Sequence, residues 1–350
     1  MRRKSMTRYS FFICLAAGLA CTSQPQEEMA PKAAEKAAEV TAKKPVFTIY
    51  SGRSATLVEP LLQEWAAAEG VELKLRFNKN TEALANRLVT EGQRSEADLF
   101  FAQTAGYLTT LGDRGQLRTL PDGILNQVPE TARGPKKHWV ATSGRLRVLV
   151  YSPERVKAED LPKRLEDLSQ PQYKGRIGWA PGNASLQAHV SALQSLWGAE
   201  KTKTWLAAMK AQNPARYPKN SPQVKAVDLG EIDMGWVNHY YLHKIKAKNP
   251  ALKAANHSFQ AGDAGNVMML AGVGIPKSSD QVEKAEKLIA FLLSQKGQEY
   301  FTQKAYEYPV VKGVSLHPDV KMPEGIADNS QAALNDVAAS LKMLRELGID

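Results

Sequence analysis

The chain alternates between short apolar runs and longer amphipathic segments, and this alternation limits the folds open to it. Residues 46–50 have the pattern of a buried strand, and residues 54–69 follow with apolar side chains at helical spacing. The same order of strand and helix repeats over residues 71–77, 81–91 and 97–101. Repeated βαβ units imply a mainly parallel sheet covered by helices, so we predict an α/β fold.

Two extended apolar runs, at residues 144–151 and 266–275, interrupt this alternation. We interpret them as two hinge strands that join two lobes with mixed, mainly parallel sheets. Lobe 1 then comprises residues 46–143 and 276–350, including C-terminal helices that return to it, and lobe 2 comprises residues 144–275 with the hinge strands. Ligands of open parallel sheets gather at the carboxyl ends of the strands, so we expect one ligand site between the lobes.

The N-terminus predicts export. Residues 1–20 run from a basic segment through an apolar stretch without an acidic residue, as in a secretory signal peptide. The box that ends at Cys21 resembles a bacterial lipoprotein cleavage site, although Gly18 stands where leucine is usual. We therefore predict a lipidated Cys21 at the periplasmic side or the cell surface, with plain cleavage after Ala20 as the alternative. Residues 21–45 are poor in large apolar side chains and are predicted to be a flexible tether.

Cysteine content and charge exclude several classes of protein. The two cysteines are Cys14, within the predicted signal peptide, and Cys21, so a mature disulfide, a zinc ribbon, an iron–sulfur cluster and a cysteine nucleophile are excluded. The formal net charge is +10, and removal of the four basic residues in positions 1–20 leaves 10 − 4 = +6. The basic residues are scattered among acids, so we expect no nucleic-acid partner. The sequence also lacks a Gly-x-Ser-x-Gly nucleophile elbow, and we predict a protein that is not an enzyme.

Tyr240 and Tyr241 stand where a strand-like run gives way to a charged, helix-like one. A phenol with a pKa of about 10 is neutral at pH 7, but a small trivalent cation can displace its proton and bind the phenolate oxygen. Neighbouring side chains on a regular element point in different directions, so a pair that binds one ion must lie at an irregular junction. Asn238 is a candidate N-cap for the helix that follows. The alternative is that both rings are half-buried packing.

A family resemblance becomes specific when several segments are taken together. The matching segments are residues 49–53, 95–100, 139–145, 173–178, 219–221, 230–233, 238–241 and 307–309. In this order and spacing, the chain resembles the periplasmic ferric-iron-binding proteins, which are the solute-binding components of bacterial iron ABC importers. The resemblance covers roughly residues 46–325 and implies the type II periplasmic-binding-protein fold.

The resemblance also implies a ligand and partners. Tyr240 and Tyr241 fall on the family's paired iron ligands, so Fe(III) is the expected transported ligand and an ABC transporter permease the expected partner of a monomer held at the membrane by its lipid anchor. Relatives hold a carbonate or phosphate beside the iron as a synergistic anion. The residues expected to bind this anion are Asn183, Ala184, Ser185, Asn220, Asn238 and Arg145. The first three lie between a strand and a helix, where free N–H groups and the helix dipole attract anions.

The departures from the family are equally informative. Ser54 stands where some relatives have a histidine ligand, and Gln103 where they have a carboxylate ligand, so both are at most cleft contacts. A third tyrosine used by other relatives is absent from residues 182–184. We therefore predict that this protein depends on its anion and captures a ferric–anion complex.

Other interpretations remain open at this stage. Asn220 and Asn238 are alternatively turn or cap residues, and Arg145 is alternatively a surface charge. His239 and His243 have the spacing of a helical metal pair, but we interpret them as structural or solvent-facing. A receptor of the same fold for another small solute, such as an organic anion or a polyamine, is the alternative function, and an exported enzyme is a third.

Overall fold

The computed structural model describes residues 44–349 except residues 79, 329–330 and 336. The predicted signal peptide, Cys21 and nearly all of the predicted tether lie outside the described residues. Of the helices that the structure describes, none is long and apolar enough to cross a membrane.

Strands and helices alternate along most of the chain. The strands are β1 (Val46–Ser51), β2 (Glu72–Phe77), β3 (Leu99–Ala102), β4 (Val140–Tyr151), β5 (Ile177–Trp179), β6 (Ala215–Arg216), β7 (Met234–Asn238), β8 (Ala255–His257) and β9 (Met268–Gly274). The helices are α1 (Ala55–Glu69), α2 (Thr81–Glu91), α3 (Gly106–Asp113), α4 (Asp122–Leu125), α5 (Ala184–Trp197), α6 (Ala199–Ala211), α7 (Asn220–Leu229), α8 (Tyr240–Lys246), α9 (Val282–Leu293), α10 (Gln295–Gln303) and α11 (Val337–Glu346). Short 3-10 turns occur between them, at Gly92–Arg94, Glu130–Ala132, Ala158–Asp160, Leu165–Ser169, Pro171–Tyr173 and Gln331–Asn335.

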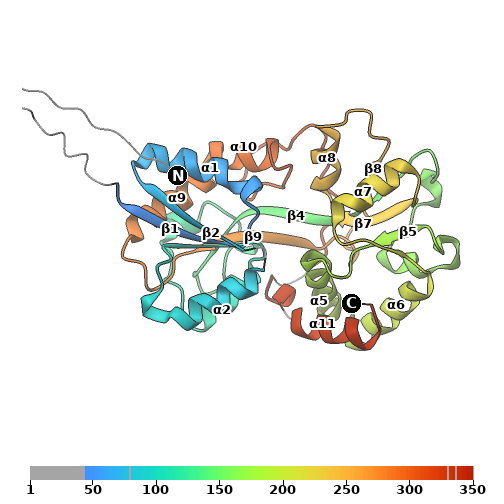
Figure 1. Ribbon diagram of the computed structural model, residues 1–350, viewed down its shortest axis with the longest axis horizontal. Coiled ribbons are helices and arrows are strands. Elements are labelled where there is room, and N and C mark those ends of the chain that lie inside the picture. Colours follow the sequence, from blue (N-terminus) through green and yellow to red (C-terminus); the bar gives the residue numbers. More distant parts are fainter. Residues whose placement is uncertain (1–43, 79, 329–330, 336, 350) are drawn as a thin grey trace, which may run out of the picture. The chain divides into compact units, whose positions relative to one another are not determined.

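The strands form one mixed sheet in the order β2-β1-β3-β9-β4-β7-β5-β6, with β8 paired to β4. At one end β1 is parallel to β2 and β3, and at the other end β5 is parallel to β6 and β7. Between them β4 and β9 run antiparallel to each other and to their neighbours. These two strands span the middle of the sheet (Figure 1). The predicted α/β class with a mixed sheet is confirmed.

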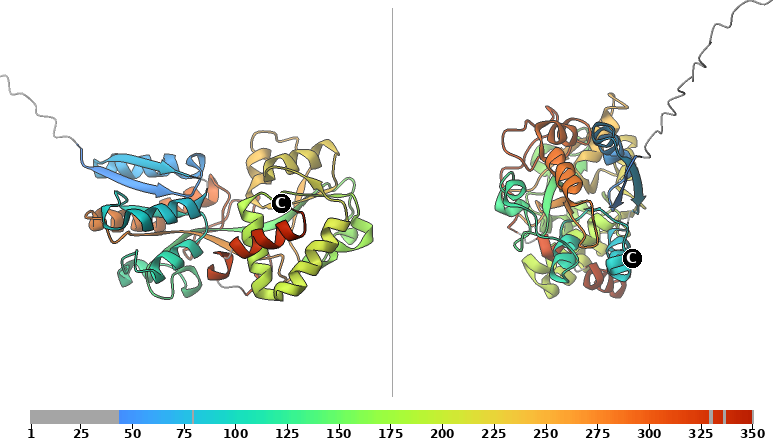
Figure 2. Two further views of the ribbon diagram at one scale, coloured as in Figure 1. Left: turned by 60° about the horizontal axis from the view of Figure 1, so that its bottom comes forward. Right: turned by 90° about the vertical axis from the view of Figure 1, so that its left-hand side faces the viewer.

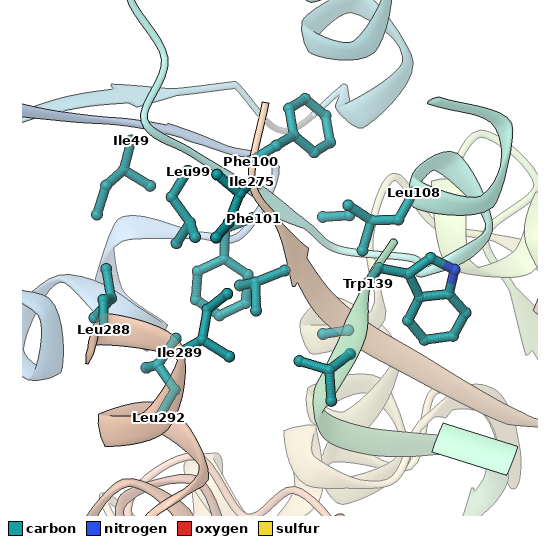
Figure 3. Close-up of a cluster of buried hydrophobic side chains, with 14 of the residues drawn as sticks. Ile49, Leu99, Phe100, Phe101, Leu108, Trp139, Ile275, Leu288, Ile289 and Leu292 are labelled. Carbon is teal, nitrogen blue, oxygen red and sulfur yellow. The ribbon is translucent and has the colours of Figure 1, made fainter. Parts of the chain in front are cut away.

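Buried apolar side chains gather around each end of the sheet. Around β1 and β3 the cluster includes Phe100, Phe101 and Ile275, with helix α9 packed against it (Figure 3). A second cluster, around β5 and β7, includes Trp236 and Leu193. The two clusters agree with the predicted pair of lobes, although the lobe boundaries themselves remain a prediction.

The two predicted hinge runs correspond to β4 and β9. Strand β4 begins earlier than predicted, because the polar side chains of Thr142 and Ser143 are also buried in the strand. The pairing of β4 with β9 shifts register between Ala141 and Ser143. At Gly272 the two backbones approach so closely that a Cβ atom would lie 2.7 Å from the Val140 carbonyl oxygen, so a larger residue would force the strands apart.

The position of the last helix differs from the prediction that the C-terminal helices return to lobe 1. Helix α11 packs on α5, beside which it lies in two views (Figures 1 and 2). Met343 and Leu344 join the cluster around Trp236, and the hydroxyls of Ser340 and Ser191 are 2.8 Å apart. An amphipathic helix can cover any complementary apolar surface, and here that surface belongs to α5.

Candidate ligand site around the tyrosine pair

Tyr240 and Tyr241 are the first two residues of α8, one residue after the end of β7. The junction residue His239 has helical backbone angles and makes no side-chain cap. The rings of Tyr240 and Tyr241 lie side by side, with centroids 4.5 Å apart and planes inclined by 33°. The two tyrosines therefore lie in the first turn of a regular helix and not at the irregular junction predicted from the sequence, yet their rings are adjacent.

The prediction that Asn238 caps helix α8 is wrong. Asn238 is the last residue of β7 and pairs with Arg147 of β4, so its backbone belongs to the sheet. Its side-chain Nδ2 donates to the Ser185 hydroxyl at 3.2 Å and to the Tyr240 hydroxyl at 3.4 Å. Asn238 thus joins the tyrosine pair to the loop that begins α5.

Tyr240 is buried, whereas Tyr241 is half-buried. Burial raises the pKa of Tyr240 far above its usual value, and the neighbouring Tyr241 and Glu307 raise it further, while Arg145 opposes the shift. The phenol is therefore neutral in the structure described here. A cation that binds the phenolate oxygen in place of the proton would stabilise the deprotonated side chain, as bound metals do for their ligands.

Arg145 and Arg147 point from β4 into the same buried region. Arg145 donates to the Gln103 carbonyl at 2.6 Å and to the Thr104 hydroxyl at 3.1 Å, and Arg147 donates to the Asn238 side chain at 3.4 Å. Neither guanidinium pairs with a carboxylate among the residues that the structure describes.

Burial is the main cause of a lowered pKa at both arginines, to about 10 for Arg145 and about 9 for Arg147. Tyr240 is the group that most favours the charge of Arg145, and Tyr241 does the same for Arg147. Buried charges normally require a counter-charge. Two deprotonated phenols at this position would supply one.

A third buried arginine, Arg53, has a carboxylate partner. It follows β1 and donates to Glu307 at 2.6 Å and to the side-chain oxygen of Gln103 at 3.0 Å. Ser143 also donates to Glu307 at 2.6 Å. Burial raises the pKa of Glu307, but the Arg53 charge and these hydrogen bonds outweigh it, so the net pKa is lowered. Gln103 therefore connects Arg53 to Arg145, through its side chain and its carbonyl.

The predicted anion loop lies at the start of α5. Asn183 is the N-cap of that helix, and its side chain accepts from the Ser185 N–H at 3.1 Å. Asn220, the first residue of α7, donates to the same Asn183 oxygen at 3.5 Å. Of the three predicted N–H donors, that of Ala184 is the one with no partner among the described residues, because Asn183 donates to the Ala180 carbonyl. The loop therefore offers fewer free donors than the sequence predicts.

The structure thus brings most of the predicted site residues together. One network contains Asn183, Ser185, Asn220, Asn238 and Tyr240, and a second contains Gln103 and Arg145. Ser54 is the exception. Its hydroxyl bonds with that of Thr56 at 3.0 Å, and no contact among the described residues joins it to the tyrosines.

A cavity of about 640 Å³ lies against a different face of α8. His239, His243 and Lys246 line it, together with residues of β8 and the segment 319–324, whereas neither tyrosine does. His239 is held by the Tyr306 carbonyl, 2.7 Å from Nε2, and its ring stacks on Tyr308. Among the described residues no group of three metal-binding His, Cys, Asp or Glu side chains occurs. His239 is thus fixed by neighbouring residues, and the structural interpretation of the two histidines stays a prediction.

The sequence profile of the bacterial extracellular solute-binding proteins matches residues 95–333. That span covers more than half of the chain. The chain belongs to this family.

Several curated relatives match about four fifths of this solute-binding protein. The major ferric iron-binding protein of Neisseria meningitidis is 33% identical over 304 residues, which are 82% of this chain and 89% of that protein. Iron-bound HitA of Pseudomonas aeruginosa has a TM-score of 0.81 at 31% identity, over 87% of this chain and 99% of that one. A Trichodesmium protein, IdiA or FutA, solved with iron and citrate ligands, has a TM-score of 0.75 at 27% identity, over 87% of this chain and all of that one.

The sequence prediction of the solute-binding site missed several charged side chains. Arg53 and Glu307 lie in segments that carry the family resemblance, yet neither they nor Arg147 and Lys244 are among the residues that the sequence predicts for the site. One signal was available: arginines at positions 145 and 147 interrupt an apolar strand on the same face, where a surface charge is unexpected.

Proposed function

We propose that this protein is an extracytoplasmic Fe(III) receptor that delivers iron to the permease of an ABC importer. Tyr240 and Tyr241 bind the ion as phenolates, and a synergistic anion such as carbonate or phosphate completes the coordination. Relatives whose names describe ferric iron binding support the ion. Hard oxygen donors such as phenolates suit a small trivalent cation.

The observation that carries this proposal is the pairing of two uncompensated guanidiniums with two phenols. Arg145 and Arg147 are buried without a carboxylate partner among the described residues, and a tyrosine is the neighbouring group that most favours the charge of each. Deprotonation of Tyr240 and Tyr241 neutralises both cations and creates two anionic ligands. A pair of rings that serves only as packing would not need these arginines.

The anion occupies the space between the loop at the start of α5 and Arg145. Asn220 and Asn238 offer side-chain amides from α7 and β7, and Ala184 offers its free N–H. Arg145 adds a charged contact once it leaves the Gln103 carbonyl. Because Ser54 and Gln103 carry no charge, the anion supplies ligands that the protein lacks, and iron affinity depends on it.

Two lobes that close on the ligand explain how a permease recognises the loaded receptor. A ligand that contacts both lobes stabilises the closed form by the contacts made only there. In this proposal the receptor is a monomer, and lipidated Cys21 holds it at the membrane through the tether of residues 21–45.

The test is the visible absorption of the mature protein titrated with ferric citrate, alongside Tyr240→Phe. Phenolate ligation produces a charge-transfer band in the parent that is lost or strongly shifted in the variant. Absence of a band at saturating ferric citrate contradicts tyrosinate ligation. The alternative, a receptor for an organic anion, is favoured by the uncompensated arginines, and it predicts anion binding that Tyr240→Phe leaves intact.

A further inference from the structure

The cavity beside α8 runs along the edge of strand β8. Its wall includes the consecutive residues 254–260, which contain the whole of β8. Successive side chains of a strand point to opposite faces of the sheet, so a cavity that contacts every residue in turn lies along the strand's edge. The segment 319–324 forms another wall, and α8 lies close to β8, where the Asn256 side chain donates to the His239 carbonyl at 2.9 Å (Figure 1). The cavity is therefore a groove between a strand edge and other parts of the chain.

The edge of β8 that faces away from β4 has free backbone groups. Strand β8 pairs with β4 and with no other strand among the described residues. Alternate residues of a strand paired on one side direct their N–H and C=O groups away from the partner. Apart from that pairing, the backbone of residues 255–258 makes no hydrogen bond with any residue that the structure describes. Such an edge can pair with another extended chain.

Rings and apolar side chains form the buried part of the groove. Leu242, Phe259 and Tyr308 line it and are buried. The ring of His257 lies edge-on to that of Phe259, with centroids 5.9 Å apart. Aromatic rings pack well against one another and against apolar groups, so this part of the wall suits a large apolar or aromatic side chain.

Exposed charges of both signs also line the groove. The lysines are Lys163, Lys246 and Lys321, and none of them forms an ion pair with any residue that the structure describes. The acids are Asp319 and Glu324. A ligand with one negative and one positive end complements such a wall.

The backbone beneath two of these lysines is held in place. The Lys163 carbonyl accepts from the Gln260 N–H at 2.8 Å, next to the end of the free edge. The Lys321 carbonyl accepts from the Tyr308 hydroxyl at 2.9 Å. The two ammonium groups therefore extend from fixed points on separate walls of one groove.

We propose that this groove binds a short peptide with free termini, which pairs with β8 as an added strand. The peptide backbone bonds to the free edge, and a large apolar side chain packs on Phe259 and Tyr308. The terminal carboxylate lies among the lysines, and the terminal ammonium lies near Asp319 and Glu324.

The size of the groove sets the length of this peptide. Its volume of about 640 Å³ lies within the range of small-ligand sites, and a chain of about three residues matches the three residues of β8. The inference is independent of the proposed iron site, since neither tyrosine lines the groove.

The experiment titrates the mature protein with the tripeptide alanyl-phenylalanyl-alanine by calorimetry. The same peptide with an acetylated N-terminus and an amidated C-terminus tests the role of the charged ends, and a peptide with glycine at its centre tests the apolar part. The double variant Lys246→Gln/Lys321→Gln removes two exposed lysines of the groove. Lys248→Gln is the matched control, because Lys248 is equally exposed and does not line the cavity.

We expect the free phenylalanine peptide to bind at least about tenfold more tightly than the capped peptide and the glycine peptide. The double variant weakens its binding about tenfold, and Lys248→Gln changes it less than about twofold. In labelled protein, the peptide shifts the amide resonances of residues 255–257.

Four results overturn the inference. One is no binding of the free peptide at about 1 mM, and another is binding that the double variant leaves unchanged. Unshifted amide resonances in β8 contradict strand pairing. Equal binding of the capped peptide contradicts recognition of free termini and indicates instead a site for an internal segment of a partner protein.

Discussion

The guanidinium of Arg147 lies over the indole of Trp236, 4.8 Å from the ring centroid. It also donates to the Trp236 backbone carbonyl. The aromatic face and the carbonyl stabilise a cation in the interior without neutralising it. This buried cation gives the proposed site a positive potential, which favours the arrival of negative charge before or together with iron.

Replacement of Arg147 is expected to have different effects on the stability of the iron-free protein and on its iron affinity. Arg147→Met removes a buried charge that has no carboxylate partner, so we expect the iron-free protein to lose less than about 1 kcal/mol or to gain stability. We expect iron binding to weaken at least about tenfold, because the variant lacks the buried positive charge that attracts the anionic ligands. Urea unfolding of the iron-free protein and chelator competition measure the two effects. A loss of more than about 3 kcal/mol in the iron-free form contradicts this account.

The anion loop permits a comparison between two matched helix caps. Asn183 caps α5 at the proposed site, and Asn80 caps α2 by accepting from the Ala83 N–H at 3.1 Å. We expect Asn183→Ala and Asn80→Ala each to cost about 1 kcal/mol of stability. Only Asn183→Ala should reduce the enhancement of iron affinity by carbonate. Both variants are titrated with iron in the presence and absence of carbonate. If carbonate raises the iron affinity of both variants equally, Asn183 acts only as a helix cap.

The stability of the iron-free protein should fall as the medium becomes acidic. Burial lowers the pKa of His189 to about 3, whereas an unfolded histidine titrates near about 6.5. Between these values the unfolded chain binds a proton that the native protein does not, so stability decreases with falling pH by up to about 1.4 kcal/mol per unit. Urea unfolding between about pH 7 and about pH 5 measures this slope. His189→Gln keeps a donor for the Ala264 carbonyl and should reduce the slope, and an unchanged slope argues against His189 as its source.

Local patterns in the sequence predict strands β1, β2, β3, β4 and β9, helices α1 and α2, and the position of the tyrosine pair, but not the short strands β6 and β8. The spacing of apolar side chains identifies such elements. The position of the junction before Tyr240 follows from the predicted strand and helix on either side of it. The ion pair of Arg53 with Glu307 joins residues 254 apart, and no local pattern indicates which distant charge a buried arginine meets. The packing of α11 on α5 was missed for the same reason.

The packing of α11 and the position of β1 determine how the protein must be produced. The family match ends at residue 333, yet Leu344 is buried further on, and β1, which pairs with β3, precedes the start of the match at residue 95. A recombinant fragment cut to the limits of the match would lack both pieces of its core and expose apolar surface on α5. A soluble recombinant protein should therefore extend from about residue 44 to the C-terminus, with any affinity tag placed before β1.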